Sequence, residues 1–201
     1  MEIIIRDYRP EDAGQVIEVY RDSVQSMRES AGGLHPDSSV ERLLSRRDEA
    51  ILASHTEGGV LLVAELDSTG RLAGMGAVAT PLSSLIGSAY SRSFYVRREF
   101  QRGKGGLPVG SMLREAAIAR AKKMGFRKIY GYSTPEAIPF HKKFGAVFYP
   151  EHDLPYLDSS ATLHYYEIEL KKSPLNGIRV EPLLFRLSAK LEPLIKGDRY
   201  G

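Results

Sequence analysis

Residues 101–111 form a glycine-rich segment with the sequence Gln-Arg-Gly-Lys-Gly-Gly-Leu-Pro-Val-Gly-Ser. The segment lies between an apolar, strand-like run that ends near Val96 and the strongest helical pattern in the chain, which begins near Val109. Glycine lets a backbone approach a ligand closely, and the first turn of a helix presents N–H groups that have no partner within the helix. A strand, a glycine-rich loop and a helix in this order predict an anion-binding site. The alternative is a flexible turn that only connects the strand to the helix.

The hydrophobic pattern around this loop predicts a single α/β (α+β) domain. Strands are expected over residues 3–5, 60–64, 72–80, 89–96, 128–132, 146–149 and 162–170. Helices are expected over residues 13–27, 38–52, 109–124 and 134–145, and Ser38 with Glu41 forms a capping-box signature for the second of them. The order βααβββαβαββ favours a mixed, mainly antiparallel sheet of six to seven strands with helices on both faces.

The composition of the chain narrows the function classes. Its 201 residues include no cysteine, which excludes disulfides, thiolate metal sites and a cysteine nucleophile. The formal net charge is only +3 and the basic residues fall in scattered pairs, so nucleic acid is not an expected partner. No apolar run reaches the ~20 residues that span a bilayer, and the first residues do not resemble a signal peptide. We therefore expect no membrane partner and a cytoplasmic location.

Two common phosphate-binding motifs do not fit the loop. The interval from Gly105 to Ser111 has the spacing of a Walker A loop, but no lysine precedes Ser111 to contact the terminal phosphates. The dinucleotide-binding motif needs a third glycine where this chain has Pro108. ATP-like mononucleotides and NAD are therefore not expected as ligands.

Three features together resemble the GNAT superfamily of acyl-CoA-dependent N-acyltransferases. They are the element order, the run Arg102-Gly103-Lys104-Gly105 before a helix, and the downstream segment Ala-Ile-Pro-Phe-His-Lys-Lys-Phe-Gly at residues 137–145. The resemblance covers residues 1 to about 170 and predicts a GNAT-like domain over residues 1–172. It implies an N-acetyltransferase that moves an acetyl (acyl) group from acetyl-CoA, or another acyl-CoA, to a primary amine by direct attack. No metal is implied.

The resemblance also assigns residues to the cofactor. In the family, the loop binds the CoA pyrophosphate through backbone amides, and the preceding strand pairs with pantetheine and orients the thioester carbonyl. The matching residues here are Tyr95, Val96, Arg102, Gly103, Lys104, Gly105, Gly106, Val109, Gly110 and Ser111. The chain departs from the family in carrying Gly106-Leu107-Pro108, which we interpret as a three-residue insertion that lengthens the loop.

A proton donor for the leaving CoA thiolate is implied at His141. Relatives often carry a tyrosine at the matching position, and a histidine with an ordinary pKa near ~6.5 suits acid or base chemistry, so we predict His141 as general acid. Its place on the apolar face of the expected helix, with Phe140 and Phe144, is equally typical of a core histidine. Tyrosines expected near the same cleft are Tyr132, Tyr149 and Tyr165.

The general base is harder to assign. Relatives often place a carboxylate on the strand before the loop, but residues 89–96 contain none. Glu65, on an earlier strand, is the fallback candidate for the base. His35, in the loop between the first two helices, is a candidate for binding the acceptor amine. The histidines show no ligand spacing such as His-Glu-x-x-His, so we predict no metal site.

Residues 173–201 are predicted to form a C-terminal extension. Apolar residues from Leu183 to Ile195 recur near helical spacing, which predicts an amphipathic helix that either packs on its own domain or forms a homodimer contact. A second function also stays open for the whole chain, namely a GNAT-like module that binds acyl-CoA as a sensor or interaction module without catalysis. The acceptor, a small molecule or a peptide amine, is not identified by the sequence.

Overall fold

A computed structural model describes residues 2–30, 37–56, 58–80, 85–155, 162–173 and 181–184. The strands are β1 (Ile3–Asp7), β2 (Gly59–Leu66), β3 (Arg71–Ala79), β4 (Ser88–Val96), β5 (Lys128–Ser133), β6 (Val147–Phe148), β7 (Leu154–Pro155) and β8 (Thr162–Glu169). The α-helices are α1 (Ala13–Ser30), α2 (Asp37–Leu44), α3 (Asp48–Thr56), α4 (Val109–Lys123) and α5 (Ile138–Lys142). Short 3-10 helices are η1 (Pro10–Asp12), η3 (Arg98–Gly106), η4 (Pro135–Ala137) and η5 (Pro150–His152). This arrangement confirms the predicted mixed α/β fold.

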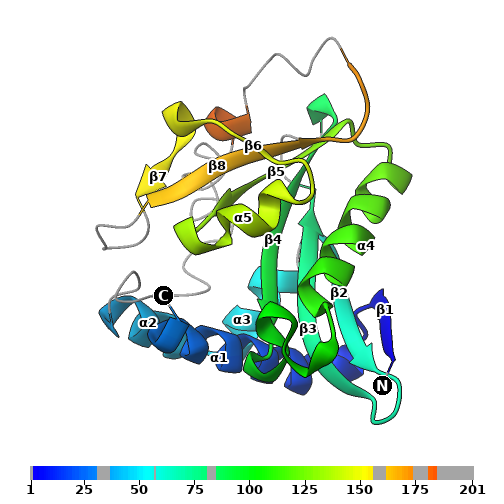
Figure 1. The fold of residues 1–201 in the computed structure, drawn as a ribbon, viewed down its shortest axis with the longest axis vertical. Coiled ribbons are helices and arrows are strands. Elements are labelled where there is room, and N and C mark those ends of the chain that lie inside the picture. Colours follow the sequence, from blue (N-terminus) through cyan, green and yellow to red (C-terminus); the bar gives the residue numbers. More distant parts are fainter. Residues whose placement is uncertain are drawn as a thin grey trace.

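The strands form one eight-stranded sheet in the order β1-β2-β3-β4-β5-β8-β6, with β7 paired to β8. Among the strand pairs in the described residues, only β4 and β5 are parallel. In Figure 1, α1 and α2 run together along the lower edge of the view, while β6 to β8 lie at the top. Strands β4 and β5 therefore join the two halves of the sheet, and their parallel pairing requires the crossover through α4.

The two faces of the sheet carry separate hydrophobic cores. Alternation along β2 directs Leu62 and Ala64 to the face covered by α4, whereas Leu61 and Val63 point to the face covered by α1, α2 and α3. The α4 side chains in the first core are Val109, Leu113, Ala117 and Ala121. The helical side chains in the second core are Val16, Val19, Tyr20, Val24, Val40 and Ile51. The sheet is thus the middle layer of three.

The structure differs from the expected elements in the second helix. The pattern over residues 38–52 predicts one helix, but the chain forms two, α2 and α3. Between them, the Arg21 side chain of α1 donates hydrogen bonds to the backbone oxygens of Leu44 (2.9 Å) and Arg46 (3.3 Å) and to Asp48 (2.8 Å). A contact with a distant residue therefore satisfies carbonyl groups at the break, and local periodicity does not report such a contact.

The predicted C-terminal extension is described at residue 173 and at residues 181–184, and the latter are helical. Glu181 is fully buried and pairs with Arg127 (3.0 Å) and Lys128 (2.9 Å), and it accepts a hydrogen bond from Ser88 (2.6 Å). Lys128 also pairs with Glu167 at 2.7 Å. This part of the extension is anchored where β4 and β5 begin, whereas most of the predicted amphipathic helix lies outside the described residues. Within the described residues, no helix is both long and apolar enough to cross a membrane.

Candidate active site

Strands β4 and β5 diverge after a short stretch of pairing. Their register joins only Ser88–Tyr90 of β4 to residues 128–130 of β5. Beyond this point β4 continues along β3 as far as Val96, while β5 continues along β8 as far as Ser133. The backbone groups that face between the two strands are therefore no longer used for β4–β5 pairing, and an extended ligand is able to pair with them.

A bulge lies in β4 within this diverging stretch. The register between β3 and β4 shifts between Met75 and Ala77, and Ser93 of β4 has a φ of 63°. A non-glycine residue in the left-handed region carries backbone strain, which commonly marks a functional site. The bulge turns the backbone of β4 locally between Ser91 and Tyr95.

The glycine-rich loop follows β4 and is open to solvent. Arg102 and Gly103 both adopt left-handed conformations, with φ of 56° and 74°. A Cβ atom built on Gly103 or Gly106 meets no atom within 4 Å, so both positions face open space. The Gln101 side chain ties the loop to β4 and α1, because its Nε2 donates to the backbone oxygen of Val96 (2.9 Å) and to Ser26 Oγ (2.8 Å).

The start of α4 completes the predicted anion-binding site. We call residues 102–106 and the first turn of α4 together the cradle. Its N-cap residue is Pro108, and no side chain caps the helix, so the first-turn N–H groups remain available to an anion. Val109 is fully buried, and a Cβ on Gly110 would meet Phe140 at 3.6 Å. Leu107, within the predicted insertion, is partly buried against the core beneath α4. The insertion is therefore anchored at its centre.

The structure brings the sequence-predicted cofactor residues together at one end of β4. Tyr95 and Val96 end the strand, residues 102–106 form the open loop, and residues 109–111 form the first turn of α4. The ring of Tyr95 points to the opposite face, where it packs on Tyr20 (5.1 Å between centroids) and His55 (5.5 Å). Only its backbone is therefore presented to the diverging strands.

His141 lies on α5 within a buried polar cluster. Its Nδ1 accepts a hydrogen bond from the Arg114 guanidinium (2.8 Å), and its ring stacks on Tyr166 with 4.4 Å between centroids. Burial, followed by the nearby Arg114 charge, lowers the pKa of His141 to about 3. The imidazole is therefore neutral at pH 7 and carries no surplus proton. The predicted role of His141 as general acid stays a prediction, and this protonation state counts against it.

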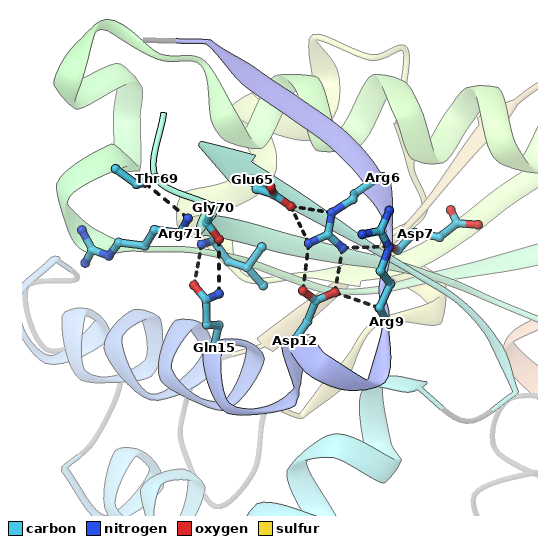
Figure 2. Close-up of polar contacts among 10 residues, drawn as sticks. Arg6, Asp7, Arg9, Asp12, Gln15, Glu65, Thr69, Gly70 and Arg71 are labelled. Atoms are coloured by element: carbon cyan, nitrogen blue, oxygen red, sulfur yellow. Dashed lines mark hydrogen bonds and ion pairs between the residues drawn. The ribbon is translucent and has the colours of Figure 1, made fainter. Parts of the chain in front are cut away.

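Glu65, the predicted base, belongs to a different cluster (Figure 2). The Arg6 guanidinium binds both oxygens of Asp12, at 2.7 and 2.8 Å, and pairs with the Glu65 carboxylate. The hydrogen bond from Arg6 lowers the pKa of Asp12, and both carboxylates raise the pKa of Arg6. These contacts join β1, β2 and η1, and even β2 lies two strands away from β4. The structure does not bring Glu65 to the diverging strands.

The remaining candidates from the sequence are three tyrosines, which lie near one another, and His35. Tyr165 is buried and donates a hydrogen bond to Glu167 (2.8 Å), and burial followed by this carboxylate raises its pKa. The Tyr132 ring lies 5.4 Å from that of Tyr165, and the Tyr149 ring 6.3 Å from it. These tyrosines therefore form a neighbouring group on β5, β8 and the segment before η5. His35 lies outside the described residues.

One histidine of the site was not singled out as a candidate from the sequence. His55 of α3 is buried, and its Nδ1 lies 2.6 Å from the Oγ of Ser93 at the β4 bulge. Burial, with further contributions from Arg46 and Arg92, lowers the pKa of His55 to about 3. The sequence separates the two residues by 38 positions, and only the packing of α3 against β4 brings them together.

Comparison with known proteins identifies the arrangement. Residues 19–146 match the sequence profile of the Acetyltransferase (GNAT) family, which is more than half of the chain. This chain belongs to the GNAT acetyltransferase family. No curated protein shows significant sequence similarity to it.

Solved GNAT structures share the fold at low sequence identity. PaiA N-acetyltransferase from Thermoplasma acidophilum, in complex with coenzyme A, is 21% identical with a TM-score of 0.60, covering 84% of this chain and 99% of that one. A GCN5-related N-acetyltransferase from Rhodopseudomonas palustris is 18% identical with a TM-score of 0.66, covering 84% and 96%. The ribosomal-protein-S18-alanine N-acetyltransferase from Escherichia coli is 13% identical with a TM-score of 0.61, covering 87% and 98%. At these identities the similarity shows the fold alone.

Proposed function

We propose that this protein is an acetyl-CoA-dependent N-acetyltransferase that acts on a primary amine. The observation that carries the proposal is the continuous path from the exposed glycine loop and the uncapped start of α4 to the diverging edges of β4 and β5. A pyrophosphate suits the first part of this path because helix N-termini and left-handed backbone turns bind anions. A polar, extended arm suits the second part because strand edges pair with extended chains.

The residues present fit an acyl-CoA in two further respects. Gly103 and Gly106 leave open space over the loop, so phosphates can approach the backbone without displacing side chains. Arg102 and Lys104 are exposed beside it and add positive charge. Binding would involve the backbone of residues 102–106 and of Val109, Gly110 and Ser111, together with the backbone of Tyr95 and Val96.

The chemistry is direct acyl transfer within a ternary complex. The neutral amine attacks the thioester carbonyl, the N–C bond forms, and the C–S bond breaks with its electron pair passing to sulfur. The amine nitrogen loses its proton to solvent, directly or through a base. The protein positions the two substrates and excludes water, which can account for a large share of the rate enhancement.

A second function, binding of acyl-CoA without catalysis, has specific observations in its favour. Strand β4, Ser88–Val96, contains no carboxylate to act as base, and His141 is neutral at pH 7. Both functions require CoA binding, but only the enzyme releases free thiol. The measurement that separates them is thiol release from acetyl-CoA across a panel of small amines, polyamines, amino acids and peptide N-termini. If CoA binds but none of the amines in the panel causes thiol release, the result would favour the non-catalytic module.

Binding itself is tested by calorimetry with CoA on a matched pair of variants. Gly103→Asp places a carboxylate in the open loop, whereas Gly58→Asp places one in another open, left-handed position, φ 67°, beyond the opposite end of the sheet. Both substitutions should cost similar stability, because both positions are equally strained and uncrowded. We expect Gly103→Asp alone to weaken CoA binding, by tenfold or more. Equal affinities of the two variants, or no CoA binding by the wild type at millimolar ligand, would contradict the proposed site.

A further inference from the structure

Arg114 is a fully buried cation on α4 with neutral partners. Its guanidinium donates to Ser91 Oγ (2.7 Å), His141 Nδ1 (2.8 Å) and Tyr166 Oη (3.0 Å). Its Cζ atom lies 4.2 Å from the centroid of the Phe94 ring. Its Nε–H is buried and has no hydrogen-bond partner, and across the described part of the chain no carboxylate forms an ion pair with this guanidinium.

This arrangement is unfavourable in the absence of a ligand. Buried charges in folded proteins are almost always paired, because removing an ion from water costs several kcal/mol that a counter-ion must offset. The other buried cations among the described residues follow that rule, since Arg127 and Lys128 both contact Glu181 and Arg97 pairs with Glu18. Hydrogen bonds and the face of Phe94 offset part of the cost for Arg114. A buried cation that has no counter-ion in the unliganded protein indicates a site where a negatively charged group binds or forms.

The position of Arg114 relative to β4 and β5 indicates which negatively charged group could form beside it. Ser91, its partner, is the first residue of β4 after pairing with β5 ends. A Cβ on Gly131, the corresponding residue of β5, would lie 2.7 Å from the Tyr166 hydroxyl and 3.0 Å from the Ser91 carbonyl oxygen. The Arg114 cluster therefore lies where the two strands begin to diverge.

The pyrophosphate cradle lies at the other end of the same edge. Because of the bulge, Val96 to Ser91 lies opposite only Gly74 to Val78 of β3, a span of about 13 Å at about 3.3 Å per residue. A ligand whose phosphates occupy the cradle and whose arm follows β4 therefore brings its far end, the thioester, toward Arg114 and His141.

We propose that Arg114, acting through His141, stabilises the thiolate that leaves when the C–S bond of the acyl-CoA breaks. The inference rests on the proposed acyl-transfer function. Because Nδ1 of His141 accepts from Arg114, the ring proton lies on Nε2, and the guanidinium polarises this N–H as a hydrogen-bond donor. The sulfur receives the electron pair of the C–S bond and accepts a hydrogen bond from Nε2–H. The thiolate takes its proton from solvent after the step, so His141 neither gains nor loses one.

This arrangement favours the transition state over the bound substrate. A thioester sulfur carries little charge, whereas the departing sulfur acquires nearly a full negative charge, so the interaction with Arg114 grows as the bond breaks. Arg114 is a positioning residue in this scheme, because it acts through His141. Among the described residues, the groups that face His141 are Arg114 from α4, Tyr166 from β8 and Phe140 from its own helix, and of these only Arg114 is charged.

The test is the thiol pKa of CoA bound to the intact protein, measured from thiolate absorbance in the ultraviolet against pH. We expect the wild type to lower the thiol pKa of CoA by about one unit or more relative to free CoA. Arg114→Met should abolish most of this shift while CoA binding through the loop persists. Arg120→Met is the control, because Arg120 lies on the same helix but pairs with Asp7 at the surface. If the wild-type protein binds CoA without shifting its thiol pKa, the inference is overturned. This measurement does not depend on whether any variant folds.

Kinetics separate this role from general acid catalysis and from a structural role. Arg114→Met should lower kcat by roughly 10²-fold with little change in the KM for acetyl-CoA. His141→Gln should retain much of the rate, because an amide also accepts from Arg114 and donates to sulfur, whereas His141→Phe should not. If His141→Gln loses as much rate as His141→Phe, His141 donates a proton, and the proposed action of Arg114 through a neutral His141 is refuted. Failure of the wild type to bind CoA would instead refute the proposed function.

Discussion

Two buried neutral histidines should make the protein sensitive to mild acid. The pKa values of His55 and His141 are both about 3 in the folded protein, against an ordinary value near ~6.5 in an unfolded chain. Between these values the unfolded state binds more protons than the folded state, so stability falls as the pH decreases. The stabilisation is fully present above about pH 6.5 and is lost progressively below it.

The expected loss follows from the size of the shift. Lowering the pH from 7.5 to 5.0 should cost about 2 kcal/mol for each histidine, or about 4 kcal/mol for the pair, from the 1.36 kcal/mol that corresponds to one pKa unit. Asp12 and Glu181 do not produce this loss at the same pH, because their pKa values are lowered from 3.8 and 4.5, so their contribution to stability is lost only below those values. The window between pH 4.5 and 6.5 therefore reports on histidine.

Urea denaturation at a series of pH values measures this dependence directly. His55→Phe and His141→Phe should each reduce the slope of unfolding free energy against pH by about half, whatever their effect on stability at pH 7.5. The tyrosine-lined site of His55 and the aromatic stack around His141 both accept a ring of similar shape. If both variants keep the wild-type slope between pH 7.5 and 5.0, the reasoning about buried neutral imidazoles is wrong.

Three further substitutions test the packing between strands, the backbone of α1 and the role of Glu65. Gly131→Ala should destabilise the protein by about 1–3 kcal/mol in thermal or urea unfolding, because its Cβ would lie 2.7 Å from the Tyr166 hydroxyl. Gly14→Ala, at a helical position with no atom within 4 Å, should instead stabilise by about 0.5–1 kcal/mol, and a stabilising Gly131→Ala would show that the site has room. Glu65→Gln should lower stability by about 1–2 kcal/mol through its lost pairing with Arg6 while kcat stays near wild type. A large fall in kcat with unchanged stability would instead support Glu65 as the base.

The sequence predicted the parts of the structure that depend on local pattern. Alternation and helical spacing located the strands and helices, and the glycine run predicted the irregular loop because left-handed conformations at Gly103 and Gly105 favour residues without a Cβ. The pattern did not predict the break between α2 and α3, since Arg21 satisfies the backbone there from another helix.

The electrostatics of the site depended on contacts that the sequence does not display. His141 was identified by position, but its protonation state is set by Arg114, 27 residues away, and by burial. Arg114 itself occurs within an otherwise apolar stripe of α4, which is the signal that could have drawn attention to it. Glu65 was selected as an available carboxylate, and its pairing with Arg6 emerges only when β1 lies beside β2.

The buried ion pairs of Glu181 imply that the folded domain extends beyond the residues that match the family profile. The profile match ends at residue 146, yet the neighbouring buried cations Arg127 and Lys128 are neutralised by two carboxylates, and one of these is Glu181. A chain that ended at residue 172 would bury one surplus positive charge beneath the starts of β4 and β5. Shortening the protein to its recognisable domain should therefore weaken the pairing of the two strands whose divergence forms the proposed acyl-CoA path.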